Sequence, residues 1–168
     1  MCIRDRLIGI PIYIVCEFIH DCGYKIAFAG QGADELFGAY AKSLRMNFEE
    51  LKRALFEDVV TLADKNLERD DHVAMANSVD LRTPYLYDEI VKLALKIPAT
   101  FKVRNGIRKY ILRKTAERIG VPKDIVYAEK KAIQYSTGVT KFIEKIAQRK
   151  NMRISEYIEH VYKEVWGE

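Results

Sequence analysis

The residues from Ile26 to Tyr40 constrain the fold of this chain more strongly than any other stretch. A short apolar run of strand length stops at Gly30 and Gly32, and the acidic pair Asp34 and Glu35 then opens a segment that can form a helix. Glycines let backbone N–H groups approach a ligand, and a helix N-terminus adds partial positive charge. The two acids lie where a divalent metal carrying a phosphate would need oxygen ligands. The corner alone leaves two interpretations open, an anion and metal site or a turn whose acids only complement the helix dipole.

Three further segments follow this corner in an order that a known family shares. Residues 30–38 read GQGADELFG, residues 69–86 read RDDHVAMANSVDLRTPYL, residues 108–113 read RKYILR and residues 129–135 read EKKAIQY. Together they resemble the synthetase domain of the asparagine synthetase (glutamine-hydrolysing) family, a branch of the ATP pyrophosphatase (PP-loop) superfamily. The resemblance extends from about residue 11 to residue 140.

The resemblance implies an ATP-dependent ligase that makes an amide. In this family a carboxylate, in the simplest case that of aspartate, is adenylated and then attacked by ammonia from glutamine, with release of AMP and pyrophosphate. The implied cofactors are ATP and Mg²⁺, and Asp34 and Glu35 are the expected metal ligands. The residues expected to contact the nucleotide are Ala29, Gly30, Gln31, Gly32, Lys109 and Lys131.

The catalytic residues that the resemblance implies are Lys130, Gln31, Arg69 and Asp80. Lys130 matches a family lysine at the α-phosphate, where an ammonium is a compact charge that can follow the phosphate, and Lys131 takes this role if the alignment shifts by one. Arg69 matches an arginine near the acidic substrate, or forms local ion pairs with its acidic neighbours. Asp80 orients a nucleophile or pairs with Arg82.

A helix face carries two further basic residues of interest. Lys109 and Arg113 are four residues apart, so they share one face, and we expect one of them to face the phosphate cleft.

Several positions depart from the family pattern. Gln31 replaces a glutamate, and an amide has neither the charge nor the basicity of a carboxylate. Ala29 and Ala33 replace serines, and Tyr87 replaces an aspartate. These changes suggest a diverged branch, so two alternatives stay open: a related ligase for another substrate, and a non-catalytic helical interaction module on the same scaffold.

The family's S-G-G-x-D-S phosphate loop and its glutaminase domain are not found in this sequence. We therefore expect residues 7–168 to be the C-terminal portion of a synthetase domain, with its N-terminal PP-loop half as a partner, and to be inactive alone. Residues 1–6 match nothing in the family and are expected to be a non-native leader.

Composition is ordinary for a soluble globular protein, with 49% apolar and 31% charged residues in a chain of 168. There is no run of eighteen apolar residues, and a net charge of +4 is too small to indicate nucleic acid. We predict no membrane and no nucleic-acid partner. The three cysteines show no metal-ligand spacing and cannot all pair, which favours a cytoplasmic setting.

The pattern predicts a mainly α fragment of an α/β PP-loop ATPase domain, with seven to eight helices and one short strand, Tyr24–Ala29. Pro11 is expected to start the first helix, Asn47 to cap a long one, and residues 130–138 to form a loop. A single strand cannot make a sheet, so the missing half should supply parallel neighbours. Expressed alone, the chain should expose apolar surface and self-associate.

Overall fold

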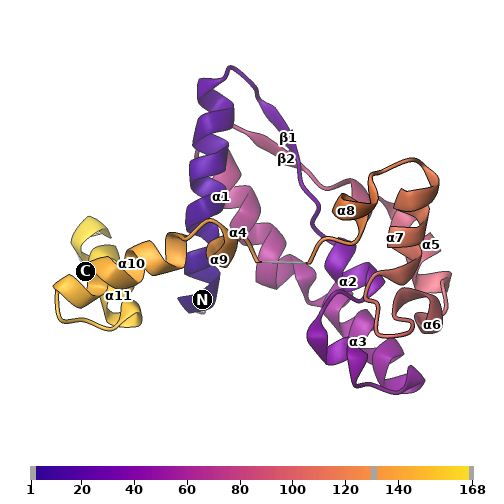
Figure 1. Ribbon diagram of the computed structural model, residues 1–168. Helices are drawn as coiled ribbons and strands as arrows, with labels where there is room; N and C mark the ends of the chain where they lie inside the picture. The colour runs from indigo at the N-terminus through magenta and orange to yellow at the C-terminus, as the bar shows by residue number, and fades with distance from the viewer. Residues whose placement is uncertain (1–2, 130–131, 167–168) are drawn as a thin grey trace.

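The computed structural model describes residues 3–129 and 132–166, and in this part the chain is mainly helical, as predicted (Figure 1). The α-helices are α1 (Ile3–Asp21), α2 (Ala33–Phe37), α3 (Phe48–Val60), α4 (Glu68–Met75), α5 (Asp88–Lys96), α6 (Ala99–Lys102), α7 (Tyr110–Arg118), α8 (Lys123–Val126), α9 (Ile133–Ser136), α10 (Val139–Arg149) and α11 (Ile154–Trp166). A π-helical turn, Ala63–Leu67, joins α3 to α4, and short 3₁₀ turns span Ala41–Leu44 and Pro84–Leu86.

The predicted strand has a partner within the chain, which corrects the expectation of a single strand. Strand β1 (Ile26–Phe28) pairs in parallel with β2 (Asp80–Arg82), and Ala29 N–H donates to the Arg82 carbonyl at 2.8 Å just beyond the ladder. Three residues are too few for a period-two pattern, so the sequence shows β2 only as an extended segment. The Phe28 side chain is 76% exposed, so the strand pair leaves apolar surface uncovered.

Helix α1 packs along α4 and carries the strand pair at its C-terminal end (Figure 1). Cys16 forms a buried cluster with Ala74 and Val79. The helix begins at Ile3, so Pro11 lies inside it and not at its start, where the sequence pattern places it. A proline removes one i to i−4 hydrogen bond, and the packing of α1 against α4 offsets this loss.

Helices α2, α3 and α5 to α8 gather on the other side of the strands (Figure 1). As predicted, Asn47 caps α3: its side chain accepts from Glu50 N–H at 3.0 Å, while the Glu50 carboxylate accepts from Asn47 N–H at 2.9 Å. Leu36 and Phe37 of α2 pack on Ala94 of α5. The glycine corner is therefore held between the strand pair and this helical layer.

In the C-terminal segment, α9 and α10 contact α1, and α11 packs on α10 (Figure 1). The sequence predicts a loop over residues 130–138, but Ile133–Ser136 forms the single-turn helix α9. One turn is too short to show a helical period, which explains the difference. In the part of the chain that the structure describes, no helix combines the length and apolar character needed to cross a bilayer.

Candidate functional site

The glycine corner connects β1 to α2 and leaves backbone donors available. The N–H groups of Gly30, Gln31 and Gly32 donate to no backbone carbonyl among the described residues. Gly32 has a φ of 87°, and a Cβ there would collide with the Leu86 side chain, so this glycine is required by the fold. A Cβ on Gly30 would meet nothing within 4 Å. The space beside Gly30 is thus open to a ligand.

Helix α2 has five residues, Ala33–Phe37. Its C-terminus is set by Gly38, which adopts φ 72° and donates to the Asp34 carbonyl at 3.0 Å. In so short a helix the collective dipole is small, and an anion at the corner would be bound mainly by individual N–H groups.

Two predicted site residues from distant parts of the sequence meet at this corner. Lys109 Nζ lies 2.5 Å from Asp34 Oδ1, and their side chains are 21% and 24% exposed. Lys109 adopts φ 53° at the N-cap of α7, and Arg108 next to it donates to the Ala39 carbonyl at 2.7 Å. Lys109 is therefore the member of the Lys109 and Arg113 pair that faces the corner.

Arg113 has a different position. Its guanidinium donates to the carbonyls of Arg108 at 3.0 Å, Val126 and Ala128. These bonds tie α7 to the segment after α8, from which the chain leads toward residues 130 and 131. Lys130 and Lys131 themselves lie outside the described residues, so their predicted roles stay predictions.

Gln31 and Arg69 are brought together by Asp70, which the sequence suggests only as a local ion-pair partner of Arg69. Asp70 is 1% exposed, and one of its carboxylate oxygens accepts from Gln31 Nε2. The other accepts from Arg69 Nε at 2.8 Å and Nη2 at 2.6 Å. Burial raises the pKa of Asp70, while hydrogen bonds from Arg69 and Gln31 oppose the rise.

The local ion pair foreseen for Arg69 is thus present and buried, since Arg69 itself is 9% exposed. A contact between residues 31 and 70 has no local signature in the sequence, although an acid next to a candidate arginine is the signal that could have drawn attention to Asp70.

Glu35 points away from Asp34. It is 4% exposed, its Oε1 accepts from the Tyr40 hydroxyl at 2.5 Å, and its Oε2 has no hydrogen-bond partner within the described ranges. Burial and the Glu35 carboxylate raise the pKa of Tyr40. Asp58, whose Oδ1 pairs with Lys42 at 2.7 Å, lines the same cavity of about 580 Å³.

Asp80 lies on β2, where its Oδ2 pairs with Arg82 Nη2 at 2.6 Å. Both side chains are about half exposed, at 47% and 52%. Of the two interpretations of Asp80, the pairing with Arg82 is the one seen in the structure.

Whether Asp34 and Glu35 can bind magnesium depends on where their carboxylates point. No group of three His, Cys, Asp or Glu side chains lies together within residues 3–129 and 132–166. Magnesium bound with nucleotides commonly uses one or two carboxylates together with phosphate oxygens and water. Asp34, partly exposed at the corner, fits such a role, whereas the Glu35 carboxylate faces a separate cavity.

Comparison with known proteins shows which family this chain belongs to. The model of the asparagine synthase family matches residues 5–50 and 46–164. A putative glutamine-hydrolysing asparagine synthetase of Methanocaldococcus jannaschii is 38% identical over 96% of this chain. Glutamine-hydrolysing asparagine synthetases of Gallus gallus and Triphysaria versicolor are 33% and 32% identical over 78% and 77% of it. The chain belongs to the asparagine synthase family.

These relatives are considerably longer than the chain. It spans 37% of the length of the archaeal relative, 24% of the chicken protein and 23% of the plant protein.

Proposed function

We propose that this chain forms one wall of the adenylation site in a glutamine-dependent asparagine synthetase. The wall consists of the Gly30 corner and the Lys109–Asp34 pair. The substrates are ATP with Mg²⁺, an aspartate-like carboxylate, and ammonia derived from glutamine. The opposite wall is the PP-loop half of the same domain, a partner that the proposal requires for activity.

The observation that carries this proposal is the convergence of donors, a cation and a carboxylate at one corner. The N–H groups of Gly30, Gln31 and Gly32, which have no backbone acceptor in the described part of the chain, are suited to phosphate oxygens. Lys109 supplies a positive charge for the departing pyrophosphate, and Asp34 supplies an oxygen for the magnesium that accompanies it. Magnesium, when bound, would neutralise phosphate charge as the bond to the α-phosphate breaks.

Residues 130 and 131 complete the proposed set. The Arg113 bonds to the carbonyls of Val126 and Ala128 hold the segment that precedes them against α7. We infer that Lys130, or Lys131 in the shifted alignment, contacts the α-phosphate. Arg69 and Gln31 act indirectly in this proposal: they hold Asp70, and Gln31 presents its backbone N–H to the nucleotide. Asp80 remains a candidate for orienting the nucleophile.

The test is aspartate-dependent release of pyrophosphate by the longer protein that contains this chain. Lys109→Met and Asp34→Asn should each lower it about 100-fold, the typical effect of removing one charge-stabilising group. Lys92→Met is the matched control, because Lys92 pairs with Asp88 at 3.3 Å with both side chains largely exposed. Release within twofold of the parent in Lys109→Met would refute the assignment. A native stop codon immediately upstream of Leu7 would contradict the requirement for a second half.

Gln31 favours one alternative, a relative that uses another carboxylate. A glutamine here cannot act as a base or carry charge, as the family's glutamate can. If Gln31→Glu leaves aspartate-dependent pyrophosphate release unchanged and robust, the substitution has no bearing on the substrate. If the parent releases pyrophosphate with a different amino acid or acid and not with aspartate, the alternative holds. Failure of the folded longer protein to bind ATP with magnesium would favour the non-catalytic module.

The two cysteines that the structure describes, Cys16 and Cys22, are free thiols, which supports the proposal of a reducing, cytoplasmic setting.

A further inference from the structure

A groove between α3 and the α5–α6 segment contains a buried lysine that the proposed adenylation site does not use. Lys102, the last residue of α6, is 4% exposed. No hydrogen bond or ion pair joins its ammonium to any residue in the described ranges, and burial lowers the pKa of Lys102 with no neighbouring charge contributing. The side chain is buried over most of its length, but Nζ is not among the fully buried polar atoms without a partner, so the ammonium is accessible from the groove.

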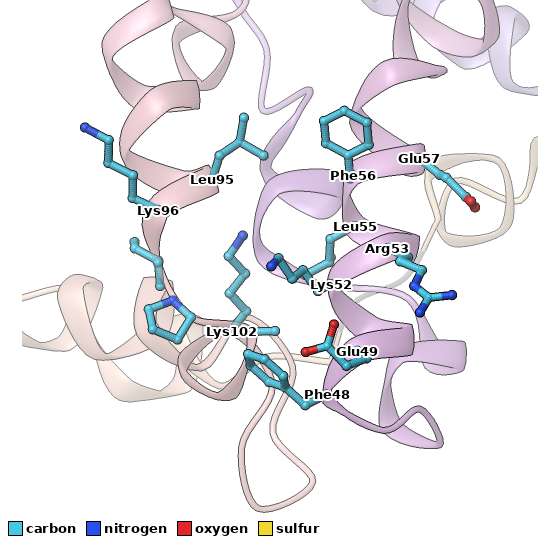
Figure 2. A pocket seen from close by; sticks show the side chains of 13 residues that line it. Phe48, Glu49, Lys52, Arg53, Leu55, Phe56, Glu57, Leu95, Lys96 and Lys102 are labelled. Carbon is cyan, nitrogen blue, oxygen red and sulfur yellow. The ribbon is translucent and has the colours of Figure 1, made fainter.

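The groove is large enough for a small molecule, with a volume of about 770 Å³. Its walls are mainly apolar. Figure 2 shows the Lys102 side chain extending from α6 into the space between the helices, with Leu95 on one side and Leu55 on the other. The apolar lining consists of Phe48, Leu55, Phe56, Leu95, Ile97, Pro98 and Ala99.

The charges around the groove favour an anion. Lys52, Arg53 and Lys96 join Lys102 in its lining, against only the two carboxylates of Glu49 and Glu57. Figure 2 shows Lys52 reaching from α3 toward the same space as Lys102. The backbone of Lys102 is well fixed, because neighbouring Ala99 packs on Leu51 and Leu55 in a buried cluster. The base of the Lys102 side chain is therefore held beside the groove.

We propose that this groove binds an amphipathic carboxylate, whose carboxylate pairs with Lys102 and whose apolar chain lies against Phe48, Leu55 and Leu95. The mainly apolar lining beside Lys102 matches a ligand that carries its charge at one end of an apolar chain. The site is separate from the Gly30 corner, and the proposal does not depend on the amide-forming reaction.

The test compares octanoate with octanol, which has the same chain length and no charge. Binding of each to the purified protein is measured by isothermal titration at pH 7. Octanoate should bind at least about tenfold more tightly than octanol, because the ion pair forms in an apolar setting. Equal affinities would show a groove that binds only the apolar chain and would overturn the proposal.

Substitutions test whether Lys102 causes the preference for octanoate over octanol. Lys102→Met, which keeps an unbranched side chain, should abolish the preference for octanoate and leave octanol binding unchanged. Lys141→Met is the control, since Lys141 is exposed on α10 and outside the groove. A preference that persists in Lys102→Met would refute the assignment.

A second measurement needs no substitution. Reductive methylation with ¹³C-formaldehyde preserves the charge of each lysine and makes it visible by NMR. Octanoate should raise the pKa of Lys102, because an anion stabilises the ammonium that it contacts. If octanoate does not change the pKa of Lys102, the proposal is overturned, and this holds even if the Lys102→Met variant does not fold.

Discussion

Replacing Gln31 with glutamate would place two carboxylates in contact at a buried position. Gln31 Nε2 donates to one oxygen of Asp70, and Arg69 occupies the other with bonds of 2.8 and 2.6 Å. Asp70 is 1% exposed, so water cannot screen the repulsion. In Gln31→Glu, a single guanidinium would face both charges.

Two limits set the expected loss of stability in Gln31→Glu. The lost hydrogen bond to a charged acceptor costs about 1.5 to 3 kcal/mol. The upper limit is set by protonation: holding a glutamic acid neutral at pH 7, from an ordinary pKa of about 4.3, costs about 3.7 kcal/mol, and the neutral acid can donate to Asp70. We expect Gln31→Glu to lower the free energy of unfolding by about 2 to 4 kcal/mol at pH 7.

The loss of stability in this variant should depend on pH. The folded-state pKa of the introduced glutamate would be raised, so its protonated form favours folding below the ordinary pKa, and this stability is lost as pH rises through the folded pKa. At pH 5 the cost of protonation is only about 1 kcal/mol. The difference between Gln31→Glu and the parent should therefore shrink markedly between pH 7 and pH 5.

Urea unfolding followed by circular dichroism at both pH values measures this difference. Adding Asp70→Asn to Gln31→Glu should restore most of the stability, because an amide at position 70 can donate to the introduced carboxylate while its oxygen accepts from Arg69. The reasoning is refuted if Gln31→Glu changes stability by less than about 0.5 kcal/mol at pH 7, if the loss is the same at pH 5, or if the double variant is no more stable than the single one.

Three further outcomes are expected. Gly32→Ala should destabilise the protein by more than about 2 kcal/mol in denaturant unfolding, from strain at φ 87° and collision with Leu86, whereas Gly30→Ala should change stability little. Burial lowers the pKa of Lys102, so the unfolded chain keeps that proton to higher pH than the folded protein does. Stability should therefore rise as pH increases toward 10.5, the ordinary pKa of a lysine. Lys102→Met should flatten this rise in melting curves measured at a series of pH values. Phe28→Lys on the exposed strand should reduce self-association in sedimentation, and a parent that is already a monodisperse monomer with a cooperative melt would contradict this.

Local features of the fold could be predicted from local chemistry. Asn47 and Glu50 form the capping box that begins α3, Pro98 follows the end of α5, and Gly120 follows α7 in a left-handed conformation. Each of these signals depends on residues only a few positions apart, which satisfy or end the backbone hydrogen bonds at a helix terminus. The strand partner β2 was missed because its three residues are defined by pairing with β1, not by their own pattern.

The candidate site also combines features that are local in the sequence with contacts between distant residues. The Gly30 corner was visible because glycines and acids lie next to one another in the sequence. The contacts that define its chemistry join residues far apart, such as Lys109 with Asp34 and Asp70 with Gln31. No local pattern specifies whether Lys109 or Arg113 reaches the corner, since that depends on how α2 and α7 pack.

The acidic pair shows how helix geometry limits what a motif can do. Neighbouring residues on a helix point about 100° apart, so Asp34 and Glu35 cannot easily chelate one ion from α2. In the structure Asp34 faces Lys109 at the corner, while Glu35 is buried against Tyr40. A metal carried by a phosphate at Gly30 would meet Asp34 first. We infer that Asp34 carries the metal role in the proposed function, so Asp34→Asn should raise the magnesium concentration needed for pyrophosphate release, whereas Glu35→Gln should act mainly on stability. An equal rise in magnesium requirement for both variants would contradict this division.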